Sequence, residues 1–240
     1  MKYINEGALY LSAPLLFNET FWLFYLLYQK RAMKSKLVYI IDPYCIWCYG
    51  NELIINHVYE TYHHRLDFKI LPVGMWSENN RRNATPELAR MLKYQARKVS
   101  DITEVVFGNN FFNLINDTSR IFDSEIPAMA ITTIDKYWRH LSMAFCNLLL
   151  RAFYYEGKDL SDKSVYEQLA RRLELSPEEF LYYQYSDEIK LLTKERFSEA
   201  RSLTYEYPSL LLVDFIGGVH PISNGYTRYS EIQRRINCFL

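Results

Sequence analysis

The sequence has no excess of charge of either sign: its 240 residues include 28 Lys+Arg and 28 Asp+Glu. Proteins that bind nucleic acid or an acidic membrane through a broad surface usually carry a basic excess. The balanced composition therefore gives no support for nucleic acid as a partner, and it argues against general membrane association. Hydrophobic residues make up 49% of the chain, which is ample material for a packed core.

The sequence also lacks the set of side chains that a structural metal site needs. Only four cysteines are present, and Cys146 and Cys238 have no second ligand nearby in the chain. The five histidines form no group with ligand spacing. Cys45 and Cys48 would supply only half of the four ligands of a structural zinc site. We expect no metal, with zinc binding and a purely structural role as the alternatives to redox chemistry for this pair.

Residues 1–35 differ from the rest of the chain. Residues 8–28 are mostly apolar and aromatic, but Asn18 and Glu19 lie near their centre. A carboxylate in the middle of a bilayer is costly, which argues against a membrane-spanning helix. No small-residue cleavage site follows the apolar part, as a secretory signal would require. We therefore treat residues 1–35 as an extension outside the core, consider Met33 as an alternative start, and expect a cytoplasmic location.

The chain is organised around the segment that carries the two neighbouring cysteines. Residues 37–41 are apolar and rich in β-branched side chains, a pattern typical of a buried strand. Pro43 ends this strand, because proline has no N–H to donate and restricts the residue before it. Apolar residues recur at helical spacing beyond Cys48, so Cys45 should lie at or just before the N-terminus of a helix.

This placement predicts a reactive thiol. A thiolate at a helix N-terminus is stabilised by unpaired N–H groups and by the positive end of the helix dipole. Both effects lower the pKa of the thiol and favour its reactive thiolate form. Cys45 is nearer the helix end and is the predicted attacking sulfur, and Cys48, one turn deeper, is the predicted resolving sulfur. We expect a redox-active Cys45–Cys48 disulfide and no other cofactor.

Helical signals dominate the middle of the chain. Residues 66–73 read as a second strand, parallel to the first because a helix connects the two. Thr85 and Pro86 are typical of a helix start. Ser164 and Ser176 each precede a glutamate at the spacing of a capping box. Residues 141–155 are predicted to form a buried helix that contains Cys146, and residues 107–116 are expected to be the least regular part.

The end of the chain returns to strand character. Residues 209–213 form a predicted strand directly after Tyr207-Pro208. A proline in front of a buried strand, in a chain with a thiol pair, suggests a cis-proline loop, and an ordinary trans turn is the alternative. A short edge strand at 219–222 and a closing helix at 229–239 follow. The expected domains are 36–84 and 204–240, which together form an α/β unit, and an inserted helical domain at 85–203.

The segment Asp42–Gly50 resembles the active-site segment of DsbA-type thioredoxin-fold proteins, in particular the cytosolic protein-disulfide isomerase group. Residues 122–125, 152–162 and 207–213 also resemble stretches of that group, and the likeness covers roughly residues 36–238. It implies a thioredoxin fold, in which helices flank a mixed central sheet, with an inserted all-helical domain. It also implies exchange of disulfides with protein or small thiol substrates.

The resemblance implies specific roles by position. Cys45 would be the nucleophile, Cys48 the resolving thiol, and Tyr207 with Pro208 the loop that binds the substrate backbone. Further expected site residues are Trp47 for substrate contact and, for tuning the thiol, Pro43 and Ile46. Tyr207 is bulkier than the small or β-branched residue that the family often has there. The alternatives are a non-catalytic protein-binding adaptor and a kappa-type glutathione transferase or isomerase, which generally carries serine at the catalytic position.

Overall fold

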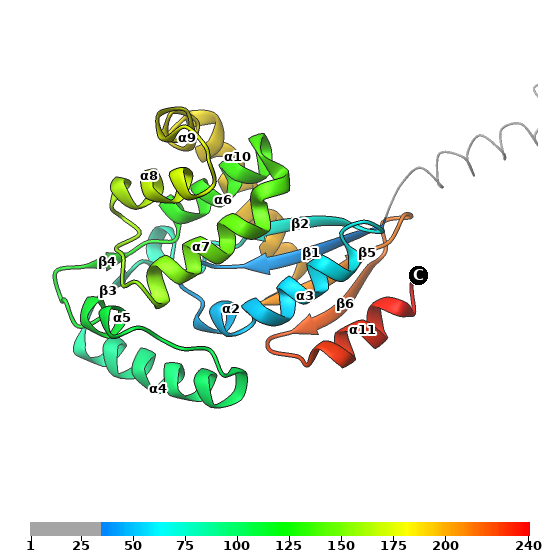
Figure 1. Ribbon diagram of the computed structural model, residues 1–240, viewed down its shortest axis with the longest axis horizontal. Coiled ribbons are helices and arrows are strands. Elements are labelled where there is room, and N and C mark those ends of the chain that lie inside the picture. The colour runs from blue at the N-terminus through cyan, green and yellow to red at the C-terminus, as the bar shows by residue number, and fades with distance from the viewer. Residues whose placement is uncertain (1–34) are drawn as a thin grey trace, which may run out of the picture. The chain divides into compact units, whose positions relative to one another are not determined.

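The structure is a computed structural model that describes residues 35–240 (Figure 1). The expectations for residues 1–34, including Met33 as an alternative start, lie outside the described residues. Within the described part of the chain, no helix is both long and apolar enough to cross a bilayer.

A four-stranded mixed sheet forms the centre of the described unit, in the order β2-β1-β5-β6. Strand β1 (Lys36–Ile41) pairs in parallel with β2 (Asp67–Pro72). On its other side β1 pairs antiparallel with β5 (Ser209–Val213), which pairs with the edge strand β6 (Val219–Asn224). The parallel pair and the return of the chain to this sheet after residue 204 confirm the predicted fold class.

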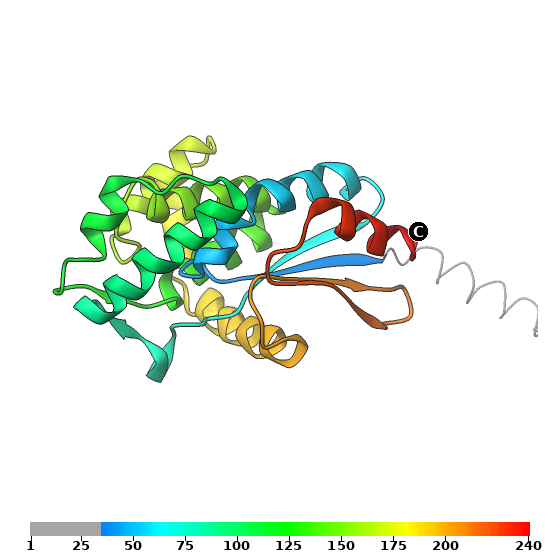
Figure 2. The same ribbon diagram turned by 90° about the horizontal axis from the view of Figure 1, so that it is seen from below.

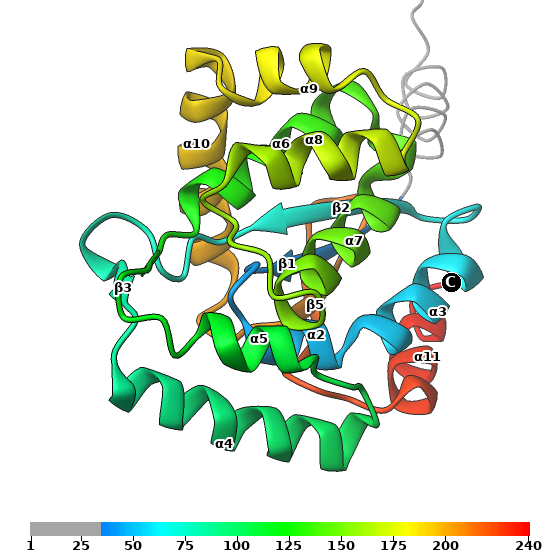
Figure 3. The same cartoon turned by 60° about the vertical axis from the view of Figure 1, so that its left-hand side comes forward.

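Helices lie around the sheet, and most of the chain between β2 and β5 is helical (Figures 1 and 3). The helices of the first and last parts of the chain are α2 (Ile46–Gly50), α3 (Glu52–Tyr62) and α11 (Tyr229–Asn237). Those of the middle part are α4 (Pro86–Thr103), α5 (Asn109–Leu114), α6 (Glu125–Tyr137), α7 (Ser142–Tyr154), α8 (Lys163–Arg172), α9 (Pro177–Gln184) and α10 (Asp187–Leu203).

The two faces of β1 pack against different helices, because successive side chains of a strand point to opposite sides. Leu37, Tyr39 and Ile41 pack in the core that also holds the inward residues of α2, α3 and α7. Val38 and Ile40 pack in a smaller cluster with residues of α10. Figure 2 shows α10, in gold, on the side of the sheet opposite α3 and α11. The chain therefore forms helix layers on both faces of a buried sheet.

Several local predictions need correction. Ser164 is not the cap of α8: the Asp162 carboxylate accepts from the Ser164 N–H at 2.8 Å, so Asp162 takes that role. The 107–116 region is more regular than expected because it contains α5. The predicted caps at Thr85 and Ser176 are confirmed, since each side-chain oxygen accepts from the backbone N–H three residues on.

Two further features were not predicted. The helix that follows Cys45 is divided at Asn51 into α2 and α3. In the segment after β2, Arg82–Asn83 forms strand β3 and pairs antiparallel with β4 (Ile121–Phe122). This small sheet ties the entry of the helical region to the start of α6.

Candidate active site

The turn between β1 and α2 positions the two cysteines. The N–H of Cys45 donates to the carbonyl of Asp42 at 3.0 Å, and the N–H of Cys48 donates to the carbonyl of Cys45 at 2.9 Å. Cys45 has extended backbone angles and is the N-cap residue of α2. The structure therefore places Cys45 where the sequence predicted, at a helix N-terminus, with Cys48 one turn further on.

The two thiols differ in their surroundings. Cys45 retains 6% exposure and lines an open cavity, whereas Cys48 is fully buried behind it. Burial raises the pKa of the Cys48 thiol well above its usual value, and the neighbouring Cys45 raises it further. Both are free thiols in this structure. The arrangement gives one accessible sulfur and one that is shielded from solvent.

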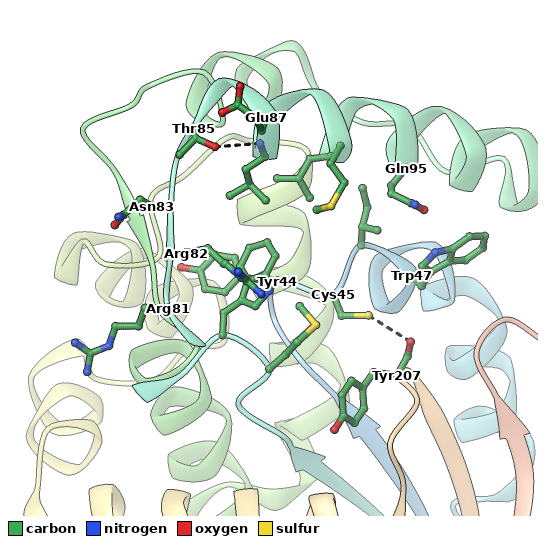
Figure 4. A pocket seen from close by; sticks show the side chains of 16 residues that line it. Tyr44, Cys45, Trp47, Arg81, Arg82, Asn83, Thr85, Glu87, Gln95 and Tyr207 are labelled. Carbon is green, nitrogen blue, oxygen red and sulfur yellow. Dashed lines mark hydrogen bonds between the residues drawn. The ribbon is translucent and has the colours of Figure 1, made fainter. Parts of the chain in front are cut away.

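The loop before β5 reaches the same place from the other end of the chain. The Tyr207–Pro208 peptide bond is cis. The Cys45 thiol donates to the carbonyl of Tyr207 at 3.6 Å, as Figure 4 shows. Pro208 is buried and Tyr207 is half-buried beside the cavity. Residues separated by 162 positions in the sequence are thus brought together around one sulfur atom.

The remaining predicted residues lie around the thiols in different ways. Trp47 is half-buried and lines the cavity next to Cys45, with the Lys98 ammonium 6.0 Å from its ring centroid. Ile46 is buried and also lines the cavity. Pro43 is buried in the turn and is not among the residues that line the cavity.

A cavity of about 980 Å³ opens beside Cys45 (Figure 4). One wall consists of Tyr44 and the segment after β2, Met75 and Trp76. The other wall is the first half of α4, through Leu88, Met91, Leu92 and Gln95. Polar residues at its far end are Arg81, Arg82, Asn83, Thr85 and Glu87. The lining is mainly apolar next to the sulfur, so a disulfide with apolar flanks fits this surface.

Sequence reasoning missed these walls. Tyr44 directly precedes Cys45, and Met75 with Trp76 follows the carboxyl end of β2, which is parallel to β1. Because the ends of adjacent parallel strands meet at one edge of a sheet, the predicted strand pair was the signal that could have found them. The contribution of α4 had no such signal, since it depends on how the helical region folds back.

A buried carboxylate, Asp42, connects the thiol turn to its surroundings. It accepts hydrogen bonds from the N–H groups of Tyr44 at 2.9 Å and Met75 at 2.6 Å, and from the Ser124 hydroxyl at 3.0 Å. Burial raises the pKa of Asp42 to about 6, against the lowering effect of these hydrogen bonds. One side chain therefore holds together the thiol turn, the cavity wall after β2 and the start of α6.

The donor set for a metal ion is absent from residues 35–240, where no three His, Cys, Asp or Glu side chains lie together in a ligand arrangement. The chemistry that the site offers is that of an accessible thiol backed by a buried one.

Comparisons with known proteins bear on this arrangement. No family model and no curated protein matches the sequence. A candidate protein disulfide isomerase from Nitrosomonas europaea superposes with a TM-score of 0.77 at 23% identity, over 85% of this chain and 97% of that one. The fold is that of the DsbA-like thioredoxin proteins.

Two further similar structures show how widely this fold is used. The cytosolic disulfide reductase DsbM from Pseudomonas aeruginosa gives a TM-score of 0.70 at 23% identity, over 85% of this chain and 97% of that one, and it has also been solved with GSH. A 2-hydroxychromene-2-carboxylate isomerase gives 0.58 at 13% identity, over 84% of this chain and 94% of that one. Likeness at these identities establishes the fold, and function must be argued from the site.

Proposed function

We propose that this protein is a thiol–disulfide oxidoreductase that exchanges disulfides through Cys45 and Cys48. The observation that supports it most is the position of the Cys45 thiol, at the N-cap of α2 and 3.6 Å from the Tyr207 carbonyl, on the wall of an open cavity. A helix N-terminus favours the thiolate, and the cavity lets a substrate disulfide reach it. Tyr207 and Pro208 would bind the substrate backbone, and Trp47 its side chains.

The proposed reaction in the reducing direction has two exchange steps. The Cys45 thiolate attacks one sulfur of the substrate disulfide, whose S–S bond breaks as a new S–S bond to Cys45 forms. The other substrate sulfur leaves as a thiolate and takes up a proton. Cys48 then releases its proton and attacks the Cys45 sulfur, which closes the Cys45–Cys48 disulfide and frees the second substrate thiol. In sum, two electrons and two protons pass from the protein dithiol to the substrate.

A thiol donor must then restore the dithiol. The structural likeness to DsbM, which has been solved with GSH, supports a small thiol of the glutathione type as this donor. Such thiols would reduce the Cys45–Cys48 disulfide and become a disulfide themselves. We propose a cytoplasmic location and net reduction, because thiol pools keep that compartment reducing.

Reduction of insulin by dithiothreitol, followed by the turbidity of the released chains, tests this function. We expect the wild type to accelerate the reaction and Cys45→Ser to abolish the acceleration. Cys48→Ser mixed with insulin in the absence of dithiothreitol should accumulate a mixed disulfide through Cys45, because the resolving thiol is gone. Cys238→Ser is the matched control, since Cys238 is an exposed thiol on the last turn of the chain.

Acceleration that survives Cys45→Ser would overturn the proposal. A folded wild-type protein whose Cys45 reacts with iodoacetamide but which gives no acceleration would also contradict it. That second result would favour a binding adaptor, whose partner should be retained when both cysteines are changed to serine.

A further inference from the structure

One side of α4 lies along the active site for most of the helix. Five of its residues recur at spacings of three and four, which places them in one stripe along the helix. The first three line the 980 Å³ cavity, and the last two line a second hollow of about 590 Å³. In chain order the stripe is Leu88, Met91, Gln95, Lys98 and Ile102.

The two cavities meet at the reactive thiol. Both are lined by Trp47 and Tyr207, and the Tyr207 carbonyl accepts from the Cys45 thiol. In Figure 4, Cys45 lies below α4, between Tyr44 and Trp47. The far wall of the second hollow is formed by Gly225 and Tyr226, after β6. We call these two cavities together the α4 groove. Its long wall is one helix, and Cys45 lies near its middle.

The length of the α4 groove indicates the size of what it binds. Leu88 and Ile102 are separated by fourteen residues, which at 1.5 Å per residue is about 21 Å. An extended polypeptide advances about 3.3 Å per residue, so about six residues match this length. A small disulfide would occupy only the part next to Cys45.

The chemistry of the groove is apolar with a positive end. Met91 and Ile102 are 47% and 45% exposed, one in each cavity, so each part of the groove presents apolar surface. At the end near β3, Arg81 pairs with Asp123 and Glu87 pairs with Arg90, whereas Arg82 forms no ion pair with any residue in the range 35–240. At the other end the charges balance, because Lys98 and Glu206 line the same hollow.

We propose that the α4 groove binds an extended segment of a disulfide-bonded polypeptide, about six residues long. The segment has apolar residues on both sides of its cysteine and an acidic residue toward Arg82. This inference rests on the proposed function and names its substrate class. Met91, Ile102 and Arg82 are then the residues that determine specificity, and Cys45 remains the attacking sulfur.

Mixed disulfides with thionitrobenzoate give a direct test. The probes are a hexapeptide, Ac-Glu-Leu-Cys-Leu-Leu-Ser-NH₂, and N-acetylcysteine amide, each joined through cysteine to thionitrobenzoate. Attack of the Cys45 thiolate on the cysteine sulfur breaks the probe disulfide, forms the mixed disulfide with Cys45, and releases yellow thionitrobenzoate. We expect the second-order rate constant for the peptide to be at least about tenfold higher than for the short probe.

Variants then locate the source of this preference. Met91→Glu and Ile102→Glu should each lower the peptide-to-short-probe ratio at least about threefold, because each buries a charge against apolar peptide side chains. The control Leu191→Glu changes an apolar residue that is 61% exposed on α10 and lines neither cavity, and it should leave the ratio unchanged. Arg82→Glu should reverse the preference between this peptide and one with lysine in place of glutamate.

Equal rate constants for the peptide and the short probe would overturn the groove assignment while leaving thiol exchange intact. So would a ratio that falls equally in Leu191→Glu and in the two groove variants. Absence of Cys45-dependent release from both probes would instead overturn the proposed function itself, and the groove assignment with it.

Discussion

The buried carboxyl group of Asp42 makes the stability of the folded protein depend on pH. Its pKa of about 6 in the folded protein is higher than the value of about 3.9 in an unfolded chain, because burial disfavours the charged form. The folded state therefore binds more protons than the unfolded state between these two values. The stabilisation that comes from this tighter proton binding at Asp42 is fully present below about pH 4 and is lost as the pH rises through about 6.

Replacing Asp42 by asparagine should remove this dependence. The free energy of unfolding of the wild type should fall by up to about 3 kcal/mol between about pH 4 and pH 7, relative to Asp42→Asn over the same range. Urea denaturation of both proteins at several pH values measures the difference, in which the other titrating groups cancel. Two curves that stay parallel across this range would contradict the burial of an ionisable carboxyl group here.

Contact between α2 and α4 depends on the absence of a side chain at one position. Gly50, at the end of α2, lies so close to α4 that an added Cβ would collide with the Val99 side chain. Val99 is itself fully buried and has little room to move. The distance between the thiol-bearing helix and the wall of the α4 groove is therefore set by this close approach.

Gly50→Ala should destabilise the protein by about 1–3 kcal/mol through overpacking. In a Val99→Ala background the same change should stabilise it by up to about 1 kcal/mol, since alanine is the better helix former and the obstructing methyl groups are gone. Chemical denaturation of the four proteins of this double-mutant cycle measures the reversal of sign. The same effect of Gly50→Ala in both backgrounds would show that Val99 is not the obstacle.

Elements with a strong local signal were predictable from the sequence. The apolar run that became β1 and the capping residues Thr85 and Ser176 depend on neighbours a few positions away. The strands β3 and β4 have two residues each, and their pairing depends on a contact across nearly forty positions. Asp162, and not the predicted Ser164, caps α8, because both side chains can accept from nearby N–H groups and the sequence pattern alone does not decide between them.

The candidate site was likewise predictable in some parts and not in others. Cys45 was predicted at or just before a helix N-terminus with Cys48 one turn on, and Tyr207 with Pro208 beside them, and the structure brings all four together. Their catalytic roles stay predictions. The α4 stripe was not predicted as part of the site, because nothing in its own sequence indicates which of its faces meets the thiols.

Among the residues that the structure describes, those that line the site all lie within one unit, Lys34–Leu240. A protein that starts at Met33 contains this whole unit. We therefore expect it to fold cooperatively and to reduce insulin at a rate within about twofold of that of the full chain, a difference of less than about 0.5 kcal/mol in activation free energy.

Thermal denaturation and the insulin assay, run side by side on the two proteins, test this expectation. Cys45→Ser in the shorter chain is the control for cysteine dependence. Loss of the cooperative transition, or a rate more than tenfold lower in a folded protein, would show that residues 1–32 contribute to the unit or to its site.

The strand order has a consequence for a chain that is still being made. Strand β1 leaves the ribosome long before its neighbour β5, which is more than 160 residues later, and β6 must follow to cover β5. Synthesis proceeds at about 5–20 residues per second, so β5 and β6 are made on the order of ten seconds after β1 and β2. Throughout that time Cys45 and Cys48 are present while the Pro208 loop is not. The nascent chain therefore carries a thiol pair before it has a site, and the pair stays reduced in that time only if the surroundings are reducing.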